Sequence, residues 1–149
     1  MEWYRLAVIL HILGATVWVG GHLVLSLAIL PAALRSRNPT SVREFEARYE
    51  RIGIPSLALQ VVTGLILAGW WVRDIALFLP PSLPQAQFIL VKLGLLLATL
   101  VIAADARVRL IPTLNERTLD SLAYHAFAVT ALGVALVIMG VAVRTGGLP

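Results

Sequence analysis

Four long apolar segments constrain the fold of this 149-residue chain more than any other feature. They run over Leu6–Leu34, Ile52–Val72, Phe88–Ile111 and Leu122–Val143. Each is long enough for a helix to cross the ~30 Å hydrocarbon core of a bilayer. The chain is 59% hydrophobic and 13% charged, whereas soluble domains are about 45–50% apolar and about 25% charged. The sequence therefore predicts an all-α fold, a single domain over residues 1–149 made of four transmembrane helices.

Basic residues at the ends of these segments predict their orientation. Eight arginines lie in the first and third connections: Arg35, Arg37, Arg43, Arg48, Arg51, Arg107, Arg109 and Arg117. Four basic residues lie toward the opposite side: Arg5, Arg73, Lys92 and Arg144. Because cytoplasmic loops carry an excess of Lys and Arg, we expect both termini on the outer side of a bacterial-type inner membrane. The same distribution explains the net charge of +4 without nucleic acid as a partner.

Small residues and prolines add local expectations. Glycines recur along all four segments, which predicts tight helix packing and allows a homodimer. Pro55 is expected in the first turn of the second span, where a proline costs little. The apolar stretch Ile75–Leu79 precedes a group of prolines, and we expect it to lie on the membrane surface. The chain has no cysteine, which excludes disulfides and thiolate metal sites.

Three histidines are the main candidates for chemistry, because ionisable side chains inside a bilayer are costly and by default mark a function. His11 and His22 are eleven residues apart, so at about 100° per residue they share one face of the first helix. His22 lies about 24 Å below the outer boundary and His125 about 5–8 Å from the inner one. The two should therefore share a layer and form a candidate ligand pair. Asp105 is in reach of that layer, unless it pairs with a neighbouring arginine.

A second polar layer is predicted near the outer boundary. His11 lies about 8 Å below this boundary, and Lys92 enters the third segment at a similar depth. Gln60 and Thr63 lie one turn apart near the middle of the second segment. Simpler roles exist for each of these side chains. A lone histidine can form a hydrogen bond between helices, and Lys92 can extend to the interface.

Histidines on facing helices can bind a metal ion or clamp a haem. Haem iron is commonly held by histidine, small residues leave room for the macrocycle, and interfacial arginines could pair with its propionates. Copper is the alternative, because imidazole suits it. Cu(I), however, prefers thiolate and thioether ligands, and the chain offers only Met1 and Met139. Zinc would need three or four ligands at one depth, which the sequence does not obviously supply.

Short helical motifs give the chain a family resemblance. The stretch His-Ile-Leu-Gly-Ala-Thr-Val-Trp-Val-Gly-Gly, from His11 to Gly21, resembles the first-helix motif of CopD-like membrane proteins, the copper resistance D group. The runs Val-Val-Thr-Gly at Val61–Gly64 and Val-Lys-Leu-Gly around Lys92 are similar to that family as well. The resemblance covers most of the chain. It implies copper handling across the inner membrane, with His11 and His22 as stations along the first helix.

The chain is also similar to the HemJ-type protoporphyrinogen oxidases, four-helix membrane proteins with an early histidine and a lysine in the third helix. His11 and Lys92 fall at matching positions, which implies a porphyrin ligand at His11 and a lysine that meets a ring carboxylate. The aromatic and basic residues of that family near the end of the first helix are replaced here by Leu27–Pro31. His22 and His125 are extra to both patterns. The resemblance therefore implies porphyrin binding more than oxidase activity.

Three functional hypotheses follow from these observations. The leading one is a membrane-embedded protein that binds haem b for electron transfer or a haem-linked redox reaction. His22 and His125 would be its axial ligands, and His11 would belong to a second site. The alternatives are a copper-handling membrane component and a structural or assembly subunit whose histidines only connect helices. The lipid bilayer is the one partner that the sequence identifies. The residues expected around these sites are Lys92, Asp105 and Gln60.

Overall fold

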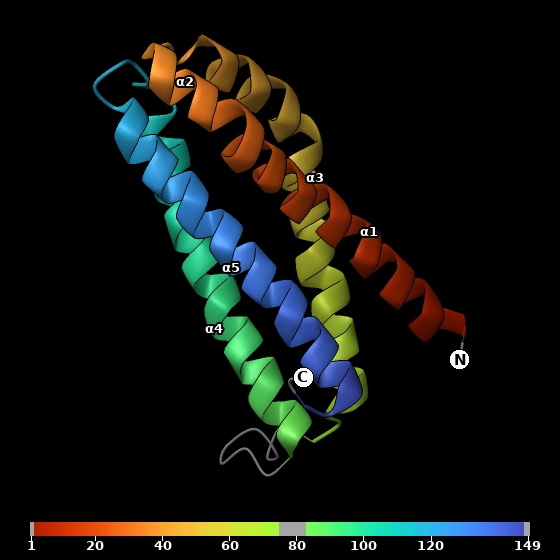
Figure 1. Cartoon of the computed structure of the whole chain (residues 1–149). Coiled ribbons are helices and arrows are strands. Elements are labelled where there is room, and N and C mark those ends of the chain that lie inside the picture. The colour runs from red at the N-terminus through yellow and green to blue at the C-terminus, as the bar shows by residue number, and fades with distance from the viewer. Residues whose placement is uncertain (1, 75–82, 148–149) are drawn as a thin grey trace.

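The computed structural model describes residues 2–74 and 83–147, and the regular elements in these ranges are all helical. Four helices there are long and apolar enough to cross a membrane, which confirms the predicted all-α class (Figure 1). They cover Glu2–Ser36, Thr40–Trp71, Pro84–Leu110 and Leu119–Thr145. The stretch Ile75–Leu79, which we expect on the membrane surface, lies outside the described residues.

The first span is a helix interrupted by one wide turn. It consists of α1 (Glu2–Val24), the π-helical turn η1 (Leu25–Ile29) and α2 (Leu30–Ser36). In η1 the Leu30 N–H donates to the Leu25 carbonyl, five residues back. Pro31 has no N–H and cannot continue a regular i→i−4 ladder, so the wide turn lies where the proline weakens the helix. Arg37, in the left-handed conformation at φ 52°, ends α2.

The second span starts earlier than its apolar segment. Helix α3 covers Thr40–Trp71 and includes the polar residues that precede Ile52. The expectation that Pro55 lies in the first turn is therefore wrong, because Pro55 lies inside α3. A proline there removes one backbone hydrogen bond from the helix interior. Because α3 continues through Pro55, its polar first half lies beside the end of the first span.

The last two spans form the other half of the bundle. The third consists of α4 (Pro84–Asp105) and a second π-helical turn, η3 (Ala106–Leu110), closed by the Ile111 N–H on the Ala106 carbonyl. The fourth is α5 (Leu119–Thr145), which ends at Gly146 with φ 79°. Both wide turns thus lie toward the end of the bundle where α2 meets α3 (Figure 1).

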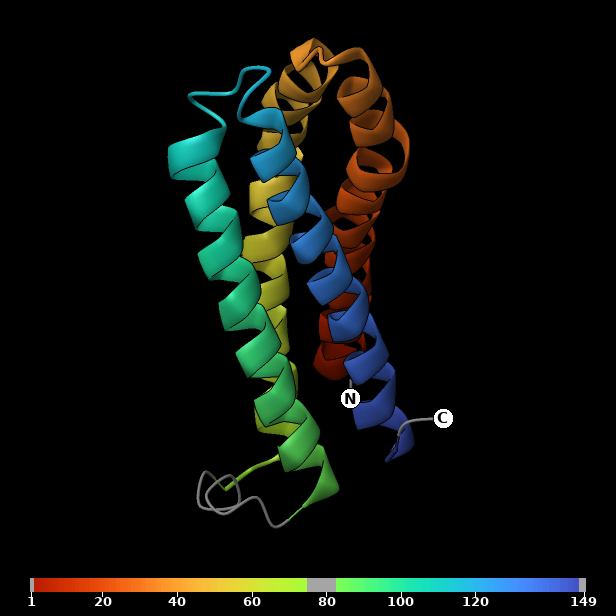
Figure 2. The same cartoon turned by 60° about the vertical axis from the view of Figure 1, so that its left-hand side comes forward.

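The bundle is made of two hairpins. Helix α1 packs along α3, α4 packs along α5, and α1 joins the hairpins through α5. By contrast, α3 and α4 touch over a short stretch only. Figure 2 shows α1 beginning and α5 ending at one end of the bundle, while the α2–α3 and η3–α5 connections lie at the other. The predicted orientation of these ends relative to the membrane stays a prediction.

The best-packed part of the core lies at the end with the two connections. Leu30, Val42 and Leu119 are fully buried there, in one cluster with Leu25 and Leu122. Many large apolar side chains on the outside of the bundle are exposed, such as Leu27, Leu97 and Val108. In a bilayer these faces contact lipid tails, which are as apolar as leucine, so their exposure carries no hydrophobic penalty.

Candidate functional site

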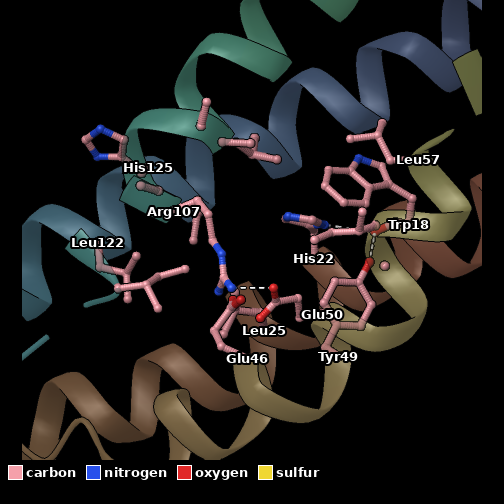
Figure 3. A pocket seen from close by; sticks show the side chains of 18 of the residues that line it. Trp18, His22, Leu25, Glu46, Tyr49, Glu50, Leu57, Arg107, Leu122 and His125 are labelled. Carbon is pink, nitrogen blue, oxygen red and sulfur yellow. Dashed lines mark hydrogen bonds and ion pairs between the residues drawn. The ribbon is translucent and has the colours of Figure 1, made fainter. Parts of the chain in front are cut away.

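A cavity of about 260 Å³ lies inside the half of the bundle that holds the two wide turns. Residues of all four spans line it, and we call it the inner cavity (Figure 3). Most of its lining is apolar, and each span contributes at least one leucine. Its polar and ionisable side chains, besides Trp18, are His22, Glu46, Tyr49, Glu50, Arg107 and His125. The inner cavity therefore contains both members of the predicted ligand pair.

His22 lines the inner cavity, and within residues 2–74 and 83–147 only one of its two ring nitrogens has a hydrogen-bond partner. Its Nδ1 lies 2.9 Å from the Trp18 carbonyl oxygen. A carbonyl only accepts, so Nδ1 carries the proton, and in the neutral ring Nε2 keeps its lone pair. The Trp18 ring packs against the imidazole with 4.3 Å between the ring centroids. The Tyr49 ring meets the imidazole edge-on, with 5.7 Å between the centroids. The imidazole is thus fixed in both orientation and tautomer.

Tyr49 supports this arrangement from α3. Its hydroxyl donates to the Trp18 carbonyl at 2.9 Å, and Phe45 stacks on its ring at 5.2 Å. The ring fills the space that a Cβ would need at Gly21, and a Cβ at Gly53 would lie only 2.8 Å from it. Glycine at these two positions therefore lets the Tyr49 ring pass between α1 and α3.

Two carboxylates and one guanidinium face the same cavity. Arg107, in η3, forms an ion pair with Glu50 in α3. Glu46, one turn before Glu50, lies within electrostatic reach of both partners. The Arg107 side chain is 46% exposed, so the pair lies at the mouth of the cavity rather than deep in the bundle. It bridges the two hairpins where α3 and α4 make few other contacts.

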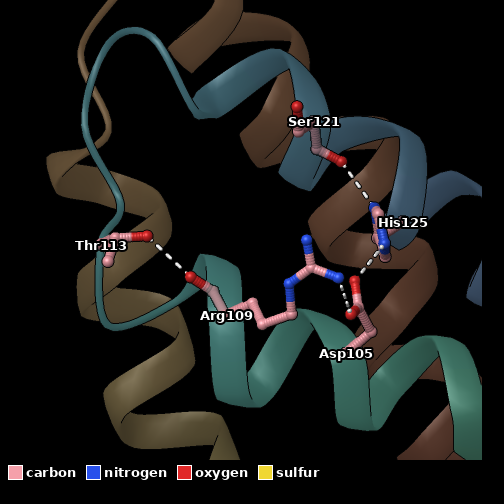
Figure 4. Close-up of polar contacts among 5 residues, drawn as sticks. All are labelled: Asp105, Arg109, Thr113, Ser121 and His125. Carbon is pink, nitrogen blue, oxygen red and sulfur yellow. Dashed lines mark hydrogen bonds and ion pairs between the residues drawn. The ribbon is translucent and has the colours of Figure 1, made fainter.

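His125 uses both of its ring nitrogens within the protein (Figure 4). Nδ1 lies 2.8 Å from the Ser121 carbonyl oxygen, and Nε2 lies 3.0 Å from Asp105 Oδ2. Arg109 donates to the other oxygen of Asp105 at 3.0 Å. Asp105 thus meets both the neighbouring arginine and the histidine of the inner layer. In this arrangement no ring lone pair of His125 is left for a metal ion.

These contacts do not fit a haem clamped between His22 and His125. Figure 3 shows the two imidazoles pointing in different directions, with Arg107 between them in this view. Iron ligation by His125 would also require it to release Asp105 or Ser121. Within residues 2–74 and 83–147, no three His, Cys, Asp or Glu side chains converge on a point that could hold a metal ion.

Two buried hydroxyls, which the sequence did not single out, hold His22 against α5. Ser26 and Thr130 are 1% and 8% exposed, and their hydroxyl oxygens are 2.7 Å apart. The Thr130 hydroxyl also lies 3.2 Å from the His22 carbonyl oxygen. Both residues carry a hydroxyl group within an otherwise apolar segment, and this pattern could have identified them from the sequence.

His11 has its own surroundings near the other end of α1. Its Nδ1 lies 2.8 Å from the Thr63 hydroxyl, which donates to the Leu59 carbonyl at 2.6 Å. That hydroxyl therefore accepts from His11 Nδ1, and Nε2 of the neutral ring keeps its lone pair. The Gln60 amide donates to the His11 carbonyl oxygen. A Cβ at Gly64 would lie 3.2 Å from the imidazole, so the ring packs directly on α3.

Lys92 approaches the same region from α4. Its Nζ lies 3.2 Å from the position that a Cβ of Gly140 would occupy, so the ammonium reaches α5 at a residue without a side chain. His11 and His22 thus share a helix but belong to separate polar regions.

Comparison with known proteins bears on the family of this chain. Residues 43–144, more than half of the chain, match the family described as copper resistance protein D, CopD. The match begins in α3, so His11 and His22 lie before it. No curated protein and no solved structure matches the chain. The similarity to HemJ-type oxidases finds no support in these comparisons.

Proposed function

Because this chain belongs to the copper resistance protein D family, we propose that it is a multi-pass membrane protein that handles copper. The family match over residues 43–144 carries the proposal. The four membrane-spanning helices agree with a function inside the bilayer. Copper is proposed here as cargo rather than as a permanent cofactor. The haem hypothesis, which led on the sequence alone, has no such support.

The proposed stations for copper are His11 and His22. A histidine that ligates a metal almost always donates its other ring N–H to an oxygen of the protein, which fixes its tautomer. His11 does so toward Thr63, and His22 does so toward the main chain of Trp18. Imidazole nitrogen is a suitable copper ligand. Both rings therefore have the tautomer that would let Nε2 bind the ion.

Two separate stations agree with a cargo that must leave again. Movement through a membrane protein needs sites that bind well enough to admit an ion and weakly enough to release it. The stations lie on one helix, eleven residues apart, which corresponds to about 16.5 Å at 1.5 Å per residue. In the proposal, copper binds at one station and then at the other along α1. His125 is left out, because both of its ring nitrogens have partners.

Purified protein in lipid nanodiscs tests the proposal. We expect copper to bind after incubation with a copper salt, and no Soret band with or without added hemin. In proteoliposomes that contain a copper-sensitive dye, His11→Ala and His22→Ala should each slow copper entry, while His125→Ala should not. Stoichiometric iron with a Soret band that disappears in His22→Ala and His125→Ala would instead establish the haem hypothesis.

A further inference from the structure

The inner cavity is accessible from the membrane between α3 and α4. Ile54 of α3 and Leu100 of α4 line the cavity, yet they are 53% and 37% exposed. The two helices touch over a short stretch only, so little of the chain covers the cavity on this side. In a bilayer these exposed side chains face lipid tails. A molecule dissolved in the membrane can therefore enter the cavity without crossing a polar surface.

One hydrogen-bond acceptor lies in this largely apolar space. The His22 imidazole gives its Nδ1 proton to the Trp18 carbonyl oxygen, which leaves Nε2 of the neutral ring as an acceptor. No residue that the structure describes donates to Nε2, and Figure 3 shows the ring pointing into the cavity. An acceptor in apolar surroundings is costly unless a donor meets it. The ligand that suits the cavity thus carries a hydroxyl or an N–H group.

The surroundings of this acceptor favour an aromatic ring as the group that carries the donor. The Trp18 ring packs on the imidazole, and the Tyr49 ring meets it edge-on. Aromatic rings add to such clusters in offset or edge-on arrangements. The cavity of about 260 Å³ exceeds the roughly 150 Å³ that holds benzene in an engineered protein core. It has room for one substituted ring, and a long tail on that ring stays outside, between α3 and α4.

We propose that the inner cavity binds the ring of a membrane quinol. A hydroxyl of the quinol donates to His22 Nε2, the ring packs beside Trp18, and the apolar tail leaves past Ile54 and Leu100. The oxidised form, a quinone, has carbonyl oxygens in place of the hydroxyls and cannot donate to Nε2. The site therefore distinguishes the reduced from the oxidised ligand. This inference does not rest on the copper function, although copper at His22 would compete with the quinol for the same nitrogen.

The fluorescence of Trp18 reports the ligand, because a quinol or quinone beside an indole quenches its emission. The test uses the chain in lipid nanodiscs, with Trp3, Trp70 and Trp71 replaced by phenylalanine so that only the fourth tryptophan, Trp18, emits. Decylubiquinol, kept reduced in the absence of oxygen, should quench Trp18 until the site is saturated. Decylubiquinone should bind about tenfold more weakly, the effect of one hydrogen bond.

Two pairs of variants locate the ligand. His22→Phe keeps a ring but removes the acceptor, so it should weaken quinol binding about tenfold and abolish the preference over the quinone. His11→Phe, in the same helix but outside the inner cavity, is the matched control and should leave both affinities unchanged. Ala104→Phe enlarges a residue of the lining and should weaken the binding of both ligands. Ala58→Phe, at an exposed alanine outside the cavity, should weaken neither.

The outcomes separate this site from simple partition into the bilayer. Quenching that rises without saturation, or equal affinity for quinol and quinone in the chain with Trp18 alone, would overturn the site. A preference for the quinol that survives His22→Phe would overturn it as well. None of these measurements contains copper. Quinol binding in a chain that does not bind copper would therefore overturn the copper function alone, and the converse would overturn the quinol site alone.

Discussion

The Tyr49 hydroxyl and the His22 imidazole donate to the same acceptor, the Trp18 carbonyl oxygen, each at 2.9 Å. One bond comes from α3 and the other from within α1, so the packing of these helices and the orientation of the imidazole depend on one atom. A change in how Tyr49 sits between the helices would therefore also reach His22. The glycines beside Tyr49 are the places where this dependence can be measured.

Gly21→Ala should destabilise the protein, because the Tyr49 ring fills the space that the new Cβ needs. We expect a loss of about 1–3 kcal/mol in the free energy of unfolding, the usual cost of overpacking. Gly20→Ala is the matched control, since a Cβ there meets nothing within 4 Å. It should be neutral or slightly stabilising. Unfolding in mixed micelles with increasing dodecyl sulfate, followed by circular dichroism, measures both.

A double variant identifies the cause of the Gly21→Ala effect. If the Tyr49 ring is responsible, Gly21→Ala should cost little in a Tyr49→Ala background, where the ring is gone. An equal cost in both backgrounds would show that the loss arises elsewhere in α1.

Removal of the Ser26–Thr130 contact should loosen η1 from α5. Hydrogen bonds between membrane helices contribute about 0.6 kcal/mol on average and about 1.7 kcal/mol at most. Ser26→Ala and Thr130→Val should each cost an amount in this range, and together less than the sum, because the hydroxyls bond to each other at 2.7 Å. Thr16→Val is the control, since the Thr16 hydroxyl donates to the Ile12 carbonyl of its own helix. Strict additivity in the mixed-micelle assay would contradict a direct bond.

Asp105→Ala should destabilise the contact between α4 and α5, because it removes the partner of His125 and of Arg109. The side chain of Asp105 is 33% exposed. We therefore expect the free energy of unfolding to fall by about 1–2 kcal/mol. This is the usual contribution of a hydrogen bond to a charged group, reduced because solvent screens the charge. Asp120→Ala breaks the Arg37–Asp120 pair, whose side chains are more than half exposed, and should have no measurable effect. A similar loss of stability in both variants would mean that the exposure of the ion pair does not determine its contribution.

The orientation of the bundle can be tested with single cysteines, because the natural chain has none. Asn38→Cys marks the α2–α3 connection, and Gly147→Cys marks the other end of the bundle. The positive-inside rule predicts that a membrane-impermeant maleimide labels Gly147→Cys in intact spheroplasts and labels Asn38→Cys only after lysis. The reverse pattern would invert the topology.

The spans could be predicted from the sequence because the bilayer fixes their length and composition. The described helices match the apolar segments to within one residue at Val72 and Ile111 and extend beyond them at the other ends, most of all at Thr40, where a polar stretch is still helical. The two π-helical turns had no clear signal. Pro31 follows one of them closely, but no proline or glycine lies in Ala106–Leu110.

The site was harder to predict because depth follows from residue counting, whereas rotation about a helix axis does not. Counting put His22 and His125 in one layer, and both line the inner cavity. It could not tell that His125 meets Asp105 and Ser121, nor that His22 keeps a free nitrogen. Glu46, Tyr49 and Glu50 escaped notice because they precede the apolar segment of the second span.

The wide turn at Leu25–Ile29 changes the direction in which side chains point along the first span. A bond to the fifth residue back, in place of the fourth, accommodates one surplus amino acid, and one residue corresponds to about 100° of rotation. The part of the span before the turn, with His11 and His22, is therefore rotated about the helix axis relative to the part after it, with Leu30. The part before the turn packs against α3 and the inner cavity, and the part after it packs into the buried cluster. A continuous α-helix would not direct both sets of side chains toward these partners.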